Sequence, residues 1–198
     1  MRAQRGHAFT VVEVLIAIAI IALLAAVIIP TAKSQLDKSQ VSAVTANLQA
    51  VREGILAYRE NVGFYPSQLV QLVTKPGTGG VTSNNSCGAA TPAANIAKWR
   101  GPYLAQAITT SGFPSGDATV LNSLTRTPAN TSGAPEGTLA VSVTDVVNST
   151  DESLAKDVEK AFDGYTTDTL TLSGGAVRWT VASGVMGTLT FHIAIRNC

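Results

Sequence analysis

The most apolar run of the chain lies near its N-terminus, from Phe9 to Pro30, and carries a single charge, that of Glu13. About 20 residues of helix, at roughly 1.5 Å per residue, cross the hydrocarbon core of a bilayer, whereas the apolar part of a cleaved secretory signal has only about 7 to 15 residues. The run therefore predicts a membrane-resident helix over residues 9–29.

Beyond Pro30 the apolar residues recur mainly at spacings of three and four among polar ones, which is the pattern of an amphipathic helix. The residues that follow this spacing are Leu36, Val41, Val44, Leu48, Val51, Ile55 and Tyr58. We expect one long helix from about Phe9 to Asn61, with residues 30–61 laid against a globular body. Pro30 removes one backbone hydrogen bond, so a kink or local melting is expected there.

The remainder, residues 62–198, predicts a globular head. Ser67 is the expected N-cap of a short helix, and Ser149-Thr-Asp-Glu152 has the pattern of a capping box ahead of another helix. Residues 75–92 and 111–137 are rich in Gly, Ser and Thr and predict loops.

Strand patterns occupy the C-terminal part of the head. The predicted strands are Leu139–Val143, Thr169–Leu172, Val177–Val181 and Leu189–Ile195. Short glycine-bearing links between the last three favour antiparallel hairpins. The predicted fold class is therefore α+β, with a long N-terminal helix packed on a small antiparallel sheet.

The segment ahead of the apolar run is short, polar and basic through Arg2 and Arg5. Positive residues favour the cytoplasmic side, which places the N-terminus in the cytoplasm and the head outside. The carboxylate of Glu13 inside an apolar helix costs about 2 to 4 kcal/mol and needs a partner. If a peptidase cut just ahead of Phe9, the new α-amine of a staggered neighbouring copy would supply that partner.

The order Phe9-Thr-Val-Val-Glu13, the apolar run after it and the proline near its end resemble type IV pilins and the pseudopilins of type II secretion. The resemblance implies cleavage by a prepilin peptidase between Ala8 and Phe9, N-methylation of Phe9, and a role for Glu13 in subunit register. Ala8 stands where the family normally has glycine. The alternative is an ordinary signal anchor with Glu13 near the membrane surface.

Two motifs in the head, Gly63-Phe-Tyr-Pro66 and Trp99-Arg-Gly-Pro-Tyr103, are similar to the Gly-x-Tyr-Pro and Trp-x-Gly-Pro-Tyr motifs of the major pseudopilins. The Asp-Pro-Trp-Gly-like segment that usually follows in those proteins is missing here, which favours a pilin. The alternative explanation of both motifs is that aromatic residues beside Pro and Gly pack turns onto a core.

The two cysteines, Cys87 and Cys198, lie on the outer side in this topology, where disulfides persist. A bond between them would stabilise the fold by about 4 to 5 kcal/mol in the chain-entropy model and hold the C-terminus in place. Free or separately paired thiols are the alternative.

Little in the sequence indicates chemistry. The net charge of +1 and the charged fraction of 14% give no basic field for nucleic acid, which is not expected as a partner. His192 is expected to be a surface or sheet-packing residue, and no catalytic triad, phosphate loop or zinc spacing is recognisable, so we expect no enzyme. No cofactor is expected, although calcium remains an alternative because several acids could gather around it. These acids are Asp145, Asp151, Glu152, Asp163 and Asp168.

The sequence thus predicts a structural subunit of a type IV pilus-like or type II secretion pseudopilus filament. Before assembly it would span the inner membrane once, and afterwards it would belong to a periplasmic or extracellular filament. The expected partners are further copies of the chain, related minor pilins, the prepilin peptidase and an inner-membrane assembly platform. The alternatives are a minor pilin at a filament tip that acts in adhesion or DNA binding, and a monomeric signal-anchored exported protein.

Overall fold

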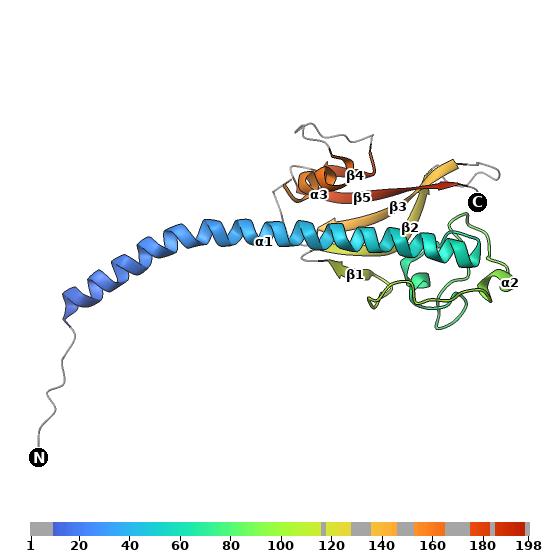
Figure 1. The fold of residues 1–198 in the computed structure, drawn as a ribbon, viewed down its shortest axis with the longest axis horizontal. Helices are drawn as coiled ribbons and strands as arrows, with labels where there is room; N and C mark the ends of the chain where they lie inside the picture. The colour runs from blue at the N-terminus through green and yellow to red at the C-terminus, as the bar shows by residue number, and fades with distance from the viewer. Residues whose placement is uncertain are drawn as a thin grey trace, which may run out of the picture. The chain divides into compact units, whose positions relative to one another are not determined.

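The computed structural model describes residues 10–115, 118–127, 136–145, 153–164, 175–182 and 185–196, and divides the chain into two compact units, Met1–Ser39 and Gln40–Cys198. Helix α1 (Val11–Val62) contributes its first part to one unit and its remainder to the other (Figure 1). It ends one residue beyond the predicted Asn61. Its helical conformation continues through Pro30, so the kink expected there stays a prediction.

The second unit is built on a five-stranded antiparallel sheet in the order β1-β2-β3-β5-β4 (Figure 1). The strands are β1 (Gly112–Ser115), β2 (Ala118–Thr127), β3 (Glu136–Asp145), β4 (Val177–Ala182) and β5 (Val185–Arg196). Helix α1 and this antiparallel sheet contribute to one hydrophobic core, which confirms the predicted α+β class.

The core lies between the C-terminal part of α1 and one face of this sheet. Alternate residues of β5 are buried, as the predicted period of two requires, and in β3 the alternate residues Leu139, Val141 and Val143 are buried together with the small Ala140. Val141 stands opposite Phe191 in the register of the two strands. Residues of α1 at spacings of three and four complete the core. They are Val44, Leu48, Val51, Ile55, Tyr58 and Val62. The amphipathic pattern therefore identified the buried face of α1 correctly.

Three of the four predicted strands are confirmed as parts of β3, β4 and β5, and the fourth, Thr169–Leu172, lies outside the described residues. The prediction of a loop over residues 111–137 was wrong, because β1 and β2 lie within it. The buried face of β2 includes Asn122 and Arg126, and a register shift interrupts its pairing with β3 between Val120 and Leu124. Polar residues at inward positions therefore concealed the strand pattern.

The described part of the unit also contains three short helices: η1 (Leu69–Leu72), α2 (Ala93–Ile96) and α3 (Ser153–Asp163). The prediction that Ser67 caps η1 was wrong, since η1 begins after Gln68 and the Ser67 hydroxyl donates to the Asn84 carbonyl at 2.8 Å. Helix α3 forms where it was predicted, although its proposed capping box lies outside the described residues. It packs beside β4 (Figure 1).

Candidate functional site

The first unit contains a segment of α1, Val11–Ile29, that is long and apolar enough to cross a membrane. Its mean hydropathy is 3.1, and none of it is buried within the described structure. At 1.5 Å per residue the segment covers about 28 Å, close to the thickness of the hydrocarbon core of a bilayer. The segment therefore fits the predicted membrane anchor.

Thr10 caps the N-terminus of α1. Its Oγ1 accepts a hydrogen bond from the backbone N–H of Glu13 at 3.2 Å, and its carbonyl accepts from the N–H groups of Glu13 and Val14 at 3.1 and 3.3 Å. This cap was not predicted from the sequence, although the Thr-x-x-Glu spacing of a capping box is its signal.

Glu13 is the third residue of α1, and its side chain is exposed. The first turn of a helix carries a partial positive charge, which stabilises a carboxylate. The single acid of the apolar segment therefore stands at the head of the helix, next to the position where a new α-amine at Phe9 would begin the chain.

The predicted cleavage and methylation site and the predicted disulfide include residues that the structure does not describe. Ala8 and Phe9 lie outside the described residues, so cleavage and methylation stay predictions. Cys87 is not a free thiol. Because Cys198 lies outside the described residues, its pairing with Cys87 also stays a prediction.

The motif that begins at Gly63 turns the chain at the end of α1. Gly63 has a φ of 87°, and its N–H donates to the Arg59 carbonyl at 2.7 Å. The Asn95 amide donates to the carbonyl of the last helical residue at 2.8 Å, which satisfies a group that the helix leaves open. Tyr65 is buried, with the guanidinium carbon of Arg59 5.0 Å from its ring centroid. A packing role accounts for these residues.

The second motif, residues 99–103, ties η1 to α1. The Trp99 indole donates to the Gln71 carbonyl at 3.0 Å, and the Tyr103 N–H donates to the Leu72 carbonyl at 2.7 Å. The ring of Tyr103 meets those of Trp99 and Tyr58 edge-on, with both centroid distances 5.8 Å. Burial, and then the neighbouring phenol of Tyr103, raises the pKa of Tyr58 to about 12.

Gly54 allows this motif to approach α1 closely. A Cβ at Gly54 would lie 3.3 Å from both the Leu104 side chain and the Tyr103 carbonyl oxygen. Both motifs therefore hold the turn region against the helix and offer no nucleophile or acid-base pair.

Gln71 is a fully buried polar residue, and no pattern in the sequence predicted its burial. Its Oε1 accepts from the N–H groups of Ser67 and Gln68 at 2.8 and 3.3 Å, and its Nε2 donates to the carbonyls of Thr82 and Asn84, both at 2.8 Å. One amide thus joins η1 to the loop that leads to Cys87.

His192 lies in β5 on the face opposite the core, as the alternation predicted. Its Nδ1 and Nε2 lie 3.3 and 3.2 Å from the hydroxyls of Thr138 and Thr190. Burial, and then the charge of Arg178, lowers the pKa of His192 below the ordinary value of 6.5. These contacts fit the expected sheet-packing role.

Of the acids considered as calcium ligands, Asp163 is the one whose side chain is described. Its Oδ1 and Oδ2 accept from the N–H groups of Ala176 and Val177 at 2.8 and 3.0 Å. In the described part of the chain, no group of three or more His, Cys, Asp or Glu residues could hold a metal ion. Asp163 therefore supports the start of β4.

The described geometry defines an α+β protein with an exposed apolar helix that fits a membrane anchor and begins at a capped Thr-x-x-Glu. Residues 1–29 match the family model of the prokaryotic N-terminal methylation motif. The chain thus carries the signature of type IV pilins and pseudopilins, which confirms the resemblance seen in the sequence. The comparisons with curated proteins and with solved structures found no match.

Proposed function

We propose that this chain is a structural subunit of a type IV pilus-like or pseudopilus filament. The observation that carries the proposal is the coincidence of the methylation motif over residues 1–29 with an apolar helix that has no buried residue and whose single charge, Glu13, stands in the first turn. A helix that is apolar all round needs lipid or other helices around it. The membrane provides the first environment, and the filament provides the second.

In this proposal the prepilin peptidase cuts the Ala8–Phe9 bond, and Phe9 is then N-methylated. The resulting α-amine stays cationic and lies one turn or less from Glu13 of its own chain. Lipid tails are as apolar as the helix, so apolar contact alone gives little drive for helices to leave the membrane. A pair between Glu13 and the amine of a staggered neighbour relieves the cost of about 2 to 4 kcal/mol of a charge in an apolar helix and fixes the register.

The subunit would wait in the inner membrane with its N-terminus in the cytoplasm and its head outside, because Arg2 and Arg5 precede the apolar helix. An assembly platform would then add it to copies of itself and to related minor pilins. No catalytic group or cofactor has a part in this function, since the work is done by helix packing and one ion pair.

Intact-mass and N-terminal analysis of the membrane and sheared-filament fractions tests the processing step. The expected chain begins at Phe9 and carries one added methyl group. A chain that retains Met1 in both fractions contradicts the proposal. Detection of the processed chain in trace amounts among filaments of another subunit would instead support the tip-pilin alternative.

Substitution of Glu13 tests the register step. Glu13→Ala and Glu13→Gln should insert into the membrane as the unmodified chain does, but should yield far fewer filaments. The matched control is Glu60→Ala, which removes an exposed carboxylate from the other end of α1. Normal filament yield from Glu13→Ala would refute the register role.

A further inference from the structure

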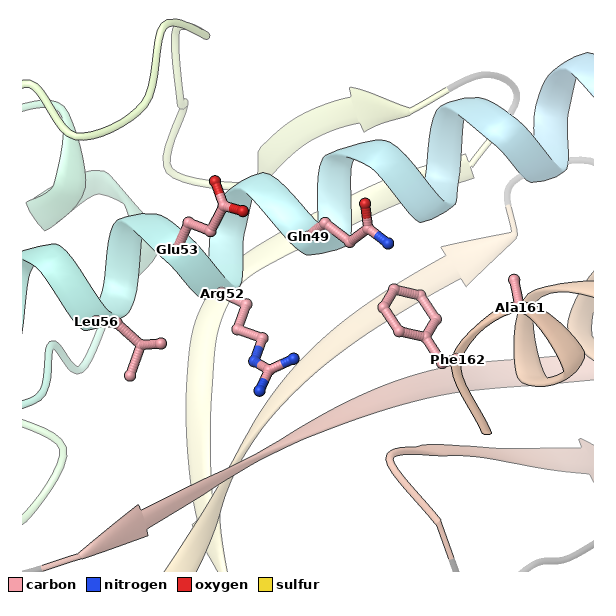
Figure 2. A pocket seen from close by; sticks show the side chains of 6 residues that line it. All are labelled: Gln49, Arg52, Glu53, Leu56, Ala161 and Phe162. Carbon is pink, nitrogen blue, oxygen red and sulfur yellow. The ribbon is translucent and has the colours of Figure 1, made fainter. Parts of the chain in front are cut away.

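A groove of about 550 Å³ lies within the second unit, between α1 and α3. Its lining residues are Gln49, Arg52, Glu53 and Leu56 of α1 and Ala161 and Phe162 of α3. Figure 2 shows the Arg52 guanidinium and the Phe162 ring facing each other across the groove. The Phe162 ring is half-buried and rests on Phe191 of β5, with ring centroids 4.6 Å apart, so the apolar wall is held in place by the core.

Leu56 marks this groove as an unusual part of the surface. It is 43% exposed, and it is the only large hydrophobic side chain that is exposed within the described residues of the second unit. The other large apolar side chains whose burial is described in this unit are buried or half-buried. A leucine that protrudes beside an aromatic wall therefore gives this surface the apolar centre that a protein contact requires.

The charges beside Leu56 differ in sign on the two sides of the helix. Arg52 and Glu53 both line the groove but leave α1 in different directions, with the Arg52 guanidinium turned toward α3 and the Glu53 carboxylate turned away from α3 (Figure 2). Both side chains are exposed, and neither has a hydrogen-bond or ion-pair partner within the described residues. One flank of the exposed helix is thus basic and the other is acidic.

We propose that the groove between α1 and α3 is a contact site for a second copy of this chain, in which Arg52 of one copy pairs with Glu53 of the next. The basic flank of one copy attracts the acidic flank of another copy, whereas two flanks of the same sign would repel each other. A contact between two different surfaces of the same molecule is heterologous, and when its rotation does not close a ring it continues as an open helical filament. Leu56 of the incoming helix would pack against Phe162 of the receiving copy.

This inference rests on the proposed function, because it names a contact between heads in the same filament. It differs from the pairing of Glu13 with the N-terminal amine, since it places a second ion pair outside the membrane segment. Peripheral charge pairs of this kind mainly set orientation and suppress wrong partners.

Charge reversal tests the pair. Arg52→Glu and Glu53→Arg should each lower filament yield by about tenfold or more, because like charges that meet in a contact are strongly unfavourable. The double variant Arg52→Glu/Glu53→Arg exchanges the two signs and should restore most of the yield. Lys98→Glu is the matched control, as it makes the same change of charge at another exposed position and should assemble normally.

Photo-crosslinking locates the contact. A photoreactive amino acid at the position of Leu56 should link two copies of the chain in assembled filaments, and the captured peptide of the neighbour should include residues 53–60 or 161–162. The same group at Ala50, which is exposed on α1 but does not line the groove, should give little of this product.

The outcomes separate this inference from the proposed function. If the single reversals assemble normally, if the double variant fails to recover, or if position 56 captures only another protein, the contact is refuted while the filament function stands. If the unmodified chain forms no filament and position 56 captures no second copy, both are refuted. Urea unfolding of each variant shows whether a loss of yield comes from a loss of folding, and a folded single variant with low yield supports the contact.

Discussion

The indole of Trp99 donates a 3.0 Å hydrogen bond to the backbone carbonyl of Gln71, a residue whose own side chain is fully buried. The backbone carbonyl of Gln71 therefore binds Trp99, and the side-chain amide of Gln71 binds the loop that precedes Cys87. Three segments far apart in the sequence meet at this one residue.

We predict that Gln71→Leu destabilises the protein by about 3 kcal/mol or more. The substitution keeps the volume of the side chain but leaves the part-buried N–H groups of Ser67 and Gln68 and the carbonyl of Thr82 without the partner that Gln71 provides, whereas the Asn84 carbonyl keeps the Ser67 hydroxyl. Each group that loses its partner costs about 1 to 3 kcal/mol. The change in the free energy of unfolding is measured by urea unfolding of the full chain in detergent, with tryptophan fluorescence as the signal. Gln106→Leu at an exposed position is the control and should stay within about 0.5 kcal/mol of the parent. Equal stability of the two variants would contradict the role of Gln71.

A second prediction concerns Asp163, whose two carboxylate oxygens accept from the N–H groups of Ala176 and Val177. Asp163→Ala leaves both groups at the start of β4 without an acceptor, so the free energy of unfolding should fall by about 1 to 3 kcal/mol. Asp157→Ala removes an exposed carboxylate from the same helix and should have little effect. Hydrogen exchange should also be faster at Ala176 and Val177 in Asp163→Ala, and unchanged exchange there would count against this account.

A third prediction follows from His192. Burial, and then the charge of Arg178, lowers the pKa of this imidazole in the folded chain below the 6.5 of the unfolded chain. In the range between these two pKa values the unfolded state binds more protons, so stability rises with pH there. The full contribution is present above pH 6.5 and is lost as the pH falls toward the folded pKa. Thermal unfolding across this range should show the slope, and His192→Gln should flatten it.

The sequence was sufficient where one physical pattern dominated. The spacing of Leu48, Val51 and Ile55 identified the buried face of α1, and the alternation through Leu139 and Val141 identified β3, because apolar burial controls both. Strand β2 was missed because its inward positions include Asn122 and Arg126. Asn122 is buried because its Oδ1 accepts from the Val70 N–H at 2.8 Å, a contact between segments that the sequence does not place together.

The candidate site shows the same division. Glu13 could be identified from the sequence alone, because a single acidic residue within a long apolar run stands out without any knowledge of the structure. The groove could not, since Arg52 and Phe162 lie on separate helices and acquire a shared surface only through the packing of α1 and α3 on the sheet. Gln71 was missed for a related reason, because two of its four partners lie in the loop around Thr82 and Asn84.

The last prediction concerns the link between Cys87 and Cys198. The loop that bears Cys87 is held in a defined position, since Asn85 Oδ1 accepts from the Cys87 N–H at 2.9 Å and the Ser86 N–H donates to the Tyr65 carbonyl at 3.0 Å. A bond from this loop to Cys198 would fasten the chain beyond β5 to the turn that follows α1. It would close a loop of on the order of 100 residues, which stabilises by about 4 to 5 kcal/mol in the chain-entropy model.

Alkylation and mass analysis of the full chain should therefore find no reactive thiol before reduction and two thiols after it. Cys87→Ser and Cys198→Ser should lower the free energy of unfolding by similar amounts, and the double variant should lose little more than either single one, because all three remove the same bond. Alkylation of either cysteine without a reductant, or additive losses in the double variant, would show that the two residues are not paired.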